Sequence, residues 1–183
     1  MSKTTDVNLN DFIRDIPDFP KPGIMFKDIT PLLGNAEAFK FAIQTMADEF
    51  RGQDIDVITA AEARGFLFAT PLAMELGVGV VPIRKPGKLP YKKRSYSYEL
   101  EYGTDTLEMH VDGISEGQNV LVVDDLLATG GTVEACCKMI ELSKANIVSC
   151  AFLIELGFLN GCERLKPHPV YSCLLYTSDA ADE

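Results

Sequence analysis

The residues best suited to chemistry lie together in one stretch, VLVVDDLLATGGT at residues 120–132. An apolar, strand-like run ends in two carboxylates, Asp124 and Asp125, and small or hydroxyl side chains at 128–132 then open a helix-like pattern. Ligands of open α/β sheets bind at the carboxyl ends of the strands, and free amides at a helix N-terminus favour a phosphate. Carboxylates accept hydrogen bonds from vicinal hydroxyls and can hold hydrated Mg²⁺. The stretch therefore predicts a site for a ribose that carries a 5′-phosphate.

Two other phosphate-binding motifs do not fit this stretch. A Walker loop requires Gly, four residues, Gly and Lys, and a dinucleotide site requires GxGxxG. Neither pattern is present between residues 120 and 132. A pair of aspartates could also cap a helix and face water, but the LLATGGT that follows the pair favours the ligand site over that structural role.

Alternating strands and helices are predicted to position this site. Apolar periodicity and turn residues predict strands at 55–60, 78–83, 119–125 and 146–156, and helices at 36–50 (capped by Asn35), from about 65 to Gly77, and at 132–142. Between them, 95–102 and 106–111 alternate by twos, which is typical of an antiparallel hairpin. Strand, helix, strand runs with short connections imply parallel pairing. We therefore expect a single α/β domain with a mostly parallel central sheet flanked by helices and a hairpin insertion.

Two terminal segments differ from this pattern. Residues 17–34 hold four prolines and two glycines among apolar residues, so we expect an ordered but irregular hood and not a linker. Residues 177–183, TSDAADE, are small and acidic. We expect them to be a disordered extension or a sequence artefact, with a genuine terminus as the alternative.

Charge is unevenly distributed along the chain. It has 183 residues, with 27 Asp and Glu against 17 Lys and Arg, and a net charge of -10. This balance argues against a general nucleic-acid or anionic-membrane binder. Six basic residues nevertheless fall in one stretch without an acid: Arg84, Lys85, Lys88, Lys92, Lys93 and Arg94. A basic segment between two predicted strands is typical of a lid that closes on an anionic ligand. A localisation signal or a solvated turn would have the same composition.

Cysteine use and the absence of targeting patterns point to a cytoplasmic protein. The five cysteines are odd in number and form no CxxC pair, which is typical of reduced thiols. The sequence has no run of about 18 apolar residues and no uninterrupted apolar segment near its start, so neither membrane spanning nor secretion is expected. His110 and His168 have no partners at ligand spacing, so no histidine-based metal site is expected.

Four segments, in this order, resemble the type I phosphoribosyltransferases. They are PDFPKPGIMFKDITP, EARGFLF, RKPGKLP with SYSYELEYG, and VLVVDDLLATGGT, and the resemblance extends from about residue 12 to about residue 176. Members of that family transfer ribose 5-phosphate from phosphoribosyl pyrophosphate (PRPP) to a nucleobase. More narrowly, the segments are similar to the adenine-specific branch. The resemblance implies purine salvage, in which adenine and PRPP give AMP and pyrophosphate.

Within that resemblance, the acidic and loop residues are implied to hold the ribose and its phosphates. Asp124 and Asp125 would contact the ribose hydroxyls of Mg-PRPP, and Arg64, which directly follows a strand, would face pyrophosphate and assist catalysis. The 5′-phosphate would be bound by Ala128, Thr129, Gly130, Gly131 and Thr132. The pyrophosphate would also be covered by the lid residues Lys85, Lys88 and Tyr102.

The base is implied to sit under the hood, beside Met25, Phe26 and Lys27. Phe26 would stack on the purine, while the backbone of its two neighbours reads the donors and acceptors of the purine edge. Glu101 is the implied catalytic residue for adenine proton transfer or for organising the closed lid, and the alternative is a solvated strand residue. Ala128 stands where the hypoxanthine and guanine relatives carry an aspartate that interacts with the purine, so any proton handling must come from elsewhere.

The implied mechanism is Mg²⁺-assisted displacement of pyrophosphate through a transition state that resembles an oxocarbenium ion. Such a reaction needs leaving-group neutralisation and exclusion of water more than it needs a protein nucleophile. Mg²⁺ would be held mainly by PRPP, near Asp124 and Asp125, without a dedicated protein site. The resemblance further implies a homodimer.

The expected organisation has three parts: an N-terminal arm and base-binding hood at 1–34, a core at 35–176 with a flexible lid at about 84–105, and the tail at 177–183. Two functional alternatives stay open. One is transfer to another 6-substituted purine or to xanthine. The other is a PRPP-sensing regulator, which should carry a basic surface for nucleic acid.

Overall fold

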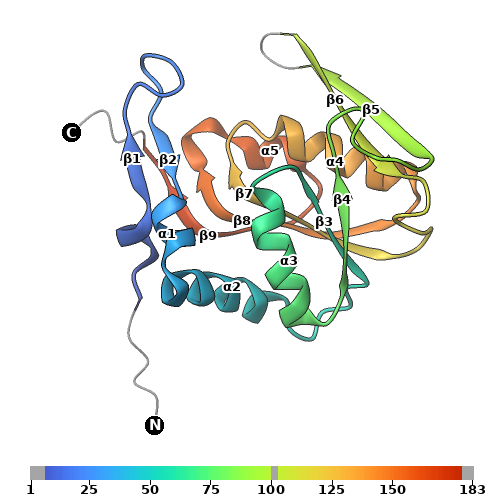
Figure 1. Cartoon of the computed structure of the whole chain (residues 1–183), viewed down its shortest axis with the longest axis horizontal. Coiled ribbons are helices and arrows are strands. Elements are labelled where there is room, and N and C mark those ends of the chain that lie inside the picture. Colours follow the sequence, from blue (N-terminus) through green and yellow to red (C-terminus); the bar gives the residue numbers. More distant parts are fainter. Residues whose placement is uncertain (1–6, 100–102, 179–183) are drawn as a thin grey trace.

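A five-stranded parallel sheet forms the centre of the molecule in the computed structural model, which describes residues 7–99 and 103–178 (Figure 1). From one edge to the other, its strands are β4 (Gly79–Ile83), β3 (Val57–Ala61), β7 (Asn119–Leu127), β8 (Asn146–Leu156) and β9 (Val170–Tyr176). Every neighbouring pair in this sheet is parallel. The predicted α/β class and parallel sheet are therefore confirmed.

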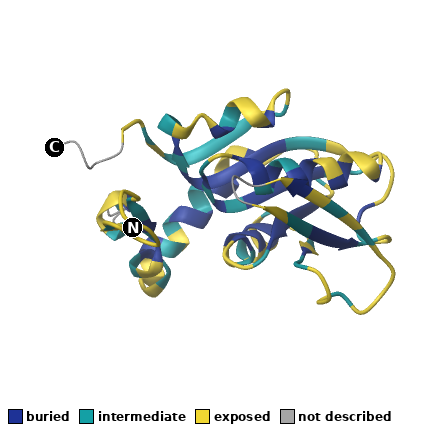
Figure 2. Cartoon of the chain, turned by 90° about the horizontal axis from the view of Figure 1, so that it is seen from above, coloured by how far each residue is buried: buried dark blue, intermediate teal, exposed yellow. Residues whose placement is uncertain are grey.

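Helices cover both faces of the sheet. α2 (Ala36–Phe50) and α3 (Gly65–Leu76) pack on one face, and α4 (Gly131–Leu142) packs on the other, with the short α5 (Gly161–Leu165) beside it. Successive strand residues supply the two cores in turn, because side chains alternate across a strand: Ile58 belongs to the α2 and α3 side, and Val57 to the α4 side. In Figure 2 the buried residues concentrate in the sheet and on the helix faces turned towards it.

Local sequence explains where the helices begin and end. The Asn35 side chain accepts hydrogen bonds from the backbone N–H groups of Glu37 and Ala38, which caps α2 as predicted. Gly77 ends α3 in a left-handed conformation with φ of 72°, which glycine adopts without a Cβ penalty. None of the described helices combines the length and the apolar character required to cross a membrane.

A separate hairpin stands beside the α4 face of the sheet. Its strands β5 (Lys93–Glu99) and β6 (Thr104–His110) pair in the antiparallel sense, as expected from their alternating pattern. Tyr98, Leu107 and Met109 turn inward and join the core formed with α4. The basic segment 84–94 leads from β4 into β5 and contacts β6 through Arg84 and Lys85, so it lies beside a hairpin that is packed on the domain.

The hood contains a small sheet of its own. β1 (Arg14–Ile16) pairs with β2 (Phe26–Asp28) in the antiparallel sense, and α1 (Thr30–Gly34) follows directly. These elements extend the predicted irregular segment 17–34 with two strands that the sequence did not indicate. Each strand has three residues, which is too short for an alternating pattern to be recognised.

Lys27 ties the hood to the last strand of the sheet. Its side chain is almost fully buried, and its Nζ lies 2.7 Å from Asp15 Oδ1 and 4.2 Å from the centre of the Tyr176 ring. The Tyr176 hydroxyl donates to Asn10 Oδ1 at 2.9 Å. The hood is thus held against β9 by an ion pair, a cation–π contact and a hydrogen bond.

Candidate active site

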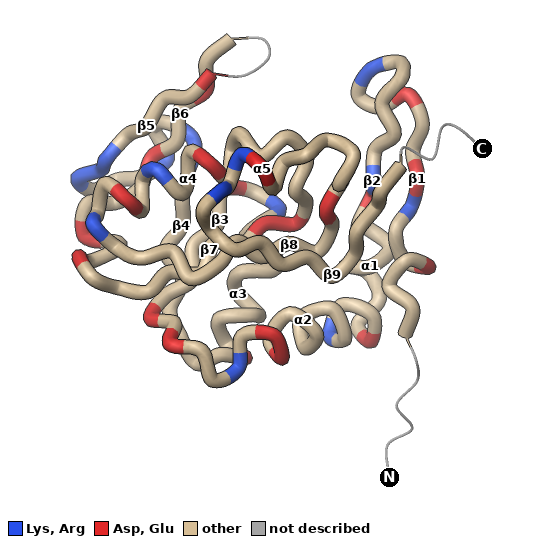
Figure 3. The backbone as a smooth tube through the Cα atoms, turned by 180° about the vertical axis from the view of Figure 1, so that it is seen from behind, with Lys and Arg blue, Asp and Glu red and all other residues tan. Residues whose placement is uncertain are grey.

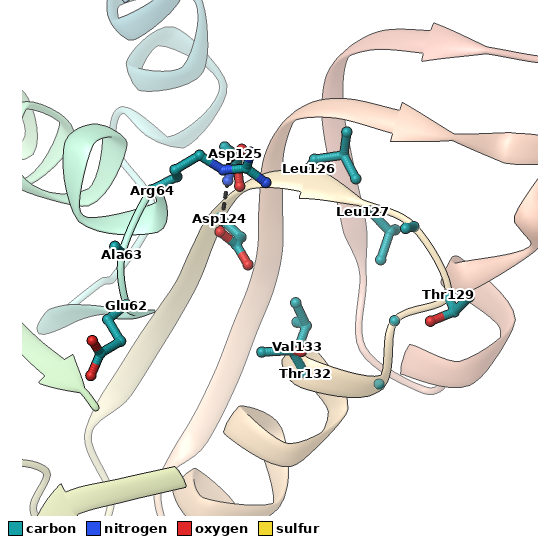
Figure 4. Close-up of a pocket in the computed structure, with 13 residues that line it drawn as sticks. Glu62, Ala63, Arg64, Asp124, Asp125, Leu126, Leu127, Thr129, Thr132 and Val133 are labelled. Carbon is teal, nitrogen blue, oxygen red and sulfur yellow. Dashed lines mark hydrogen bonds and ion pairs between the residues drawn. The ribbon is translucent and has the colours of Figure 1, made fainter. Parts of the chain in front are cut away.

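A cavity of about 470 Å³ opens where β3 and β7 end (Figure 4). It is lined by Glu62, Ala63, Arg64 and residues 124–133. Because parallel strands end at the same edge of a sheet, the connection after β3 and the connection after β7 meet there. The structure therefore brings together Arg64, both aspartates and the whole segment 128–132, which the sequence placed in one site.

The segment 128–132, called the phosphate loop below, turns from β7 into α4. Gly130 has φ of 83°, a left-handed conformation that favours glycine, and α4 begins at Gly131, one residue before the predicted start. The first N–H groups of a helix have no partner inside the helix. Those of α4 are therefore directed at the cavity end of the loop, where an anion would be stabilised.

The two aspartates lie inside β7, which continues to Leu127, two residues beyond the predicted end. Consecutive strand residues point to opposite sides. Asp125 is 7% exposed in its side chain and its Oδ2 lies 2.8 Å from Arg64 Nε, whereas Asp124 Oδ1 accepts the backbone N–H of Asp125 at 2.9 Å. Asp125 therefore fixes Arg64 at the cavity wall, whereas Asp124 accepts from the backbone and lines the cavity.

Desolvation raises the pKa of Asp124 well above its ordinary value, and the negative charge of Asp125 raises it further. The positive charge of Arg64 acts in the opposite direction but does not offset these effects. Asp124 is partly buried at the cavity wall, next to the carboxylate of Asp125, and these surroundings explain why its pKa is raised. A cationic or hydroxyl-rich ligand would relieve this cost.

Gly65 allows α3 to approach β7 closely enough to present Arg64. A Cβ atom at this position would lie 2.9 Å from Asp124 Oδ1 and 3.3 Å from the carbonyl oxygen of Val123. A side chain at this position would push the carboxylate aside. The small residue after Arg64 in EARGFLF is thus explained by the contact between the start of α3 and the acidic end of β7.

Glu62 is a cavity residue that the sequence did not single out. Its carboxylate, 10% exposed, accepts the backbone N–H of Lys85 at 2.6 Å and Arg84 Nε at 3.3 Å, and it also pairs with Lys88. Desolvation acts to raise the pKa of Glu62, but the hydrogen bonds from Lys88, Lys85 and Arg84 outweigh it and lower the pKa to about 2. The only local signal was an acid two residues before Arg64, at a strand end.

Neither Lys85 nor Lys88 lines the cavity in the described part of the chain. Lys88 pairs with Glu62, and Lys85 pairs with Asp105 of β6, whose pKa is lowered chiefly by that hydrogen bond. The Tyr98 hydroxyl lies 3.2 Å from Asp105 Oδ2 and 3.4 Å from Thr132 Oγ1. The end of the hairpin near its turn is thereby connected to the phosphate loop. Figure 3 shows Lys and Arg interleaved with Asp and Glu around β5 and β6.

Phe26 reaches the rim of the site from the hood. Its ring centre lies 5.4 Å from Arg64 Cζ, and Phe19 packs edge-on against it at 5.1 Å. Lys27 has its side chain committed to Asp15, so only its backbone could face a ligand. Met25, Phe26 and Lys27 are not among the described residues that line the cavity. Glu101 and Tyr102 lie outside the described residues.

The residues of the cavity suit Mg²⁺ only in part. Asp124 and Asp125 provide the hard oxygen donors that Mg²⁺ prefers, but Asp125 already pairs with Arg64. Among the described residues, no group of three or more His, Cys, Asp or Glu side chains is placed to hold a metal ion. Two neighbouring carboxylates fit a metal that is bound chiefly by the phosphates of a ligand.

Comparison with known proteins identifies the family. A model of the phosphoribosyl transferase domain matches residues 32–180. The adenine phosphoribosyltransferase of Rhodopirellula baltica is 59% identical over 177 residues, which cover 97% of this chain and 86% of that protein. The crystal structure of the adenine phosphoribosyltransferase of Thermoanaerobacter pseudethanolicus superposes with a TM-score of 0.89 at 54% identity, covering 92% of this chain and 98% of that one.

A further structure, the Saccharomyces cerevisiae adenine phosphoribosyltransferase complexed with adenine and an imino-altritol bisphosphate, superposes with a TM-score of 0.84 at 40% identity. It covers 90% of this chain and 95% of that chain. The family match spans most of the sequence, and these relatives are similar over most of their own lengths. The chain therefore belongs to the phosphoribosyltransferase family and, within it, to the adenine phosphoribosyltransferases.

Proposed function

We propose that this protein forms AMP and pyrophosphate from adenine and PRPP, as a purine salvage enzyme. The observation that carries the proposal is the meeting of Arg64, Asp124, Asp125 and the phosphate loop around one cavity. The Arg64 cation matches the pyrophosphate group, and the two carboxylates match the ribose hydroxyls. The free amides of the phosphate loop match the 5′-phosphate. The yeast relative was crystallised with adenine and a bisphosphate, which agrees with such a ligand pair.

The phosphate loop holds the 5′-phosphate in this proposal. Gly130 and Gly131 leave the backbone accessible, and the start of α4 adds its unpaired N–H groups. The hydroxyls of Thr129 and Thr132 can donate to phosphate oxygens. Asp124 accepts a ribose hydroxyl, and Asp125 contributes mainly by fixing Arg64.

Arg64 faces the pyrophosphate group, since it stands at the cavity wall with its side chain half exposed. A guanidinium binds phosphate oxygens through paired N–H groups and cannot lose its charge at working pH. Lys85 and Lys88 join it only after exchanging Asp105 and Glu62 for the ligand. Tyr102 completes this lid in the proposal.

Adenine lies between the hood and the ribose site, with Phe26 against its ring. Stacking suits a planar base, and the backbone of Met25 and Lys27 reads its edge. During transfer the bond between C1 of the ribose and the pyrophosphate oxygen breaks, and a bond from C1 to N9 of adenine forms. The proton of N9 leaves to Glu101 or to solvent, because Ala128 offers no acidic or basic group.

Mg²⁺ is the cofactor in this proposal, and when bound it would supply positive charge that offsets the charge of the pyrophosphate group. The PRPP phosphates would hold the ion, with Asp124 near its coordination shell. The protein contributes Arg64 as a fixed cation, the loop amides as fixed donors and the hood as a barrier to water.

The decisive experiment follows nucleotide formation from PRPP and Mg²⁺ with each purine base. We expect AMP and pyrophosphate from adenine, and little product from hypoxanthine, guanine or xanthine. Efficient product from one of those bases, without AMP, would replace the proposed substrate. Binding of DNA or RNA without transfer to any base would instead favour the PRPP-sensing regulator.

A cytoplasmic homodimer is also part of the proposal. All five cysteines are free thiols, including Cys137 and Cys150, whose sulfur atoms lie 3.7 Å apart without a bond, as suits a reducing compartment. Leu67 and Met74 lie seven residues apart on α3 and are 45% and 80% exposed. Positions seven apart share a helix face, so these side chains form an apolar surface suited to a second copy.

A further inference from the structure

We infer that residues 160–164, the turn and helix start beside the phosphate loop, position that loop for its ligand. This inference rests on the proposed 5′-phosphate site. The 160–164 turn follows β8 and does not line the cavity in the described part of the chain. It therefore acts, in this inference, on the loop and not on the substrate.

Gly161 packs directly against the phosphate loop. A Cβ atom at Gly161 would overlap the carbonyl oxygen of Ala128 and lie 3.0 Å from Leu127 Cδ1. The contact is reciprocal, because a Cβ atom at Gly130 would lie 2.8 Å from the carbonyl oxygen of Gly161. The two backbones thus touch without a side chain between them, and any larger residue at 161 must displace the loop.

This contact determines the direction of one loop amide. The peptide group is planar, and in the trans form its C=O and N–H point to opposite sides. The cis peptides of the described chain lie elsewhere, so the bond from Ala128 to Thr129 is trans. With the Ala128 carbonyl turned to Gly161, the Thr129 N–H points away from the turn. Gly161 thereby holds this donor in the orientation that the proposed phosphate needs.

Arg164 adds an electrostatic part to the same element. Its Nη1 lies 3.5 Å from the position that a Cβ atom of Gly131 would occupy, at the start of α4. It also pairs with Glu134 in the first turn of that helix. An unpaired carboxylate there would oppose a bound phosphate dianion, because both charges compete for the same helix N-terminus. Arg164 neutralises Glu134 and keeps this end of α4 favourable to the phosphate.

The first test compares Gly161→Ala with Gly79→Ala in the full chain. A Cβ atom at Gly79 would meet nothing within 4 Å, so it is the matched control. We expect Gly161→Ala to weaken ribose 5-phosphate binding by about tenfold or more, because one charge-assisted hydrogen bond is lost. Binding of Mg-pyrophosphate should change by less than about twofold. Unchanged ribose 5-phosphate binding, or an equal loss for both ligands, overturns the inference.

A second pair of variants decides the matter if Gly161→Ala fails to fold. We expect Arg164→Gln to weaken ribose 5-phosphate binding roughly three- to tenfold, and added Glu134→Gln to restore it, because the opposing charge is then gone. If Arg164→Gln binds ribose 5-phosphate as tightly as the wild type, or if added Glu134→Gln does not restore the affinity, the inference is overturned. AMP formation by the wild type is measured separately. Its absence would remove the proposed function, whereas an active wild type with these negative results removes only the role of the turn.

Discussion

Asp124 and Asp125 are neighbours in the sequence, but their surroundings differ at the scale of single residues. Asp125 is paired with Arg64, while Asp124 lies beside that negative charge in a partly dehydrated cavity. The pKa of Asp124 is raised first by desolvation and then by Asp125. An acid whose pKa is raised by folding binds its proton more tightly in the folded state, so its ionisation costs stability.

The variant Asp124→Asn tests this balance. Above the ordinary value of 3.8, wild-type stability falls as the pH rises towards the raised pKa, and the amide avoids that loss. We therefore expect a higher melting temperature at neutral pH, a difference that shrinks as the pH falls to about 4. PRPP should bind about tenfold or more weakly, because a ribose acceptor is lost. Asp112→Asn, at an exposed turn, is the control. A lower melting temperature with unchanged PRPP binding would contradict this account.

Glu101 allows a kinetic prediction although it lies outside the described residues. Positioned acid–base groups contribute roughly 10²–10⁴-fold to a rate, so Glu101→Gln should lower kcat by about that factor. PRPP binding, measured by equilibrium titration, should change far less. The matched control is Glu99→Gln, at the exposed end of β5. Near-normal turnover in Glu101→Gln would remove the residue from the mechanism.

At the scale of elements, Glu62 joins the end of β3 to the basic segment that follows β4. Because its pKa is lowered from 4.5 to about 2, its contribution to stability is complete above pH 4.5 and is lost as the pH falls through about 2. Glu62→Gln should therefore be less stable than wild type at neutral pH and equal to it near pH 2. Chemical unfolding across this pH range measures the difference.

We also expect Glu62→Gln to lower the KM for PRPP by roughly three- to tenfold, because Arg84 and Lys88 no longer have to leave a carboxylate before they bind the ligand. Glu116→Gln is the control. Glu116 pairs with Lys144, both side chains are more than 70% exposed, and ion pairs this exposed contribute little to stability. A pH-independent stability difference, or equal effects of the two variants, would contradict the role of Glu62.

Elements with strong local signals could be predicted closely from the sequence. α2 and β8 begin and end at the predicted residues, because Asn35 caps the helix and the strand is a largely apolar run. β1 and β2 could not be predicted, since each is three residues long and depends on pairing with the other. β7 continues past its acidic pair because Leu126 and Leu127 pair with β8, which periodicity alone does not reveal.

Some features of the candidate site could likewise be predicted from the sequence, and others could not. The phosphate loop, both aspartates and Arg64 could be predicted together, because they lie at or just beyond the carboxyl ends of two neighbouring parallel strands. The partners of Lys85 and Lys88 were not predicted, because these ion pairs join residues 20 and 26 positions apart in the chain. The burial of Lys27 was also missed, since its acceptor Asp15 is reached only when the hood folds into a hairpin.

At the scale of the whole molecule, the basic stretch is compensated in space. Arg84, Lys85, Lys88 and Lys93 pair with Glu62, Asp105 or Glu108, which come from other segments. The cluster that stands out in the sequence therefore offers less positive charge to an external polyanion. This arrangement favours a small phosphorylated ligand, which can exchange with individual carboxylates, over nucleic acid.

The exposed apolar face of α3 leads to a prediction about assembly. Met74→Lys places a charge on this face, and burying an unpaired charge in an interface is costly. We expect the wild type to sediment as a dimer and Met74→Lys to shift to the monomer at the same concentration. Leu142→Lys, at the exposed end of α4, should leave the dimer intact. A monomeric wild type, or equal behaviour of the two variants, would contradict a dimer through α3.

The attachment of the hood to Tyr176 has a consequence for biosynthesis. A ribosome makes the hood early, but its support from β9 exists only after 142 further residues have been added, since the hood ends at Gly34 and β9 at Tyr176. The phosphate loop, in contrast, lies between β7 and α4, which are neighbours in the chain. During translation the hood is therefore attached to the domain only after the phosphate loop has formed.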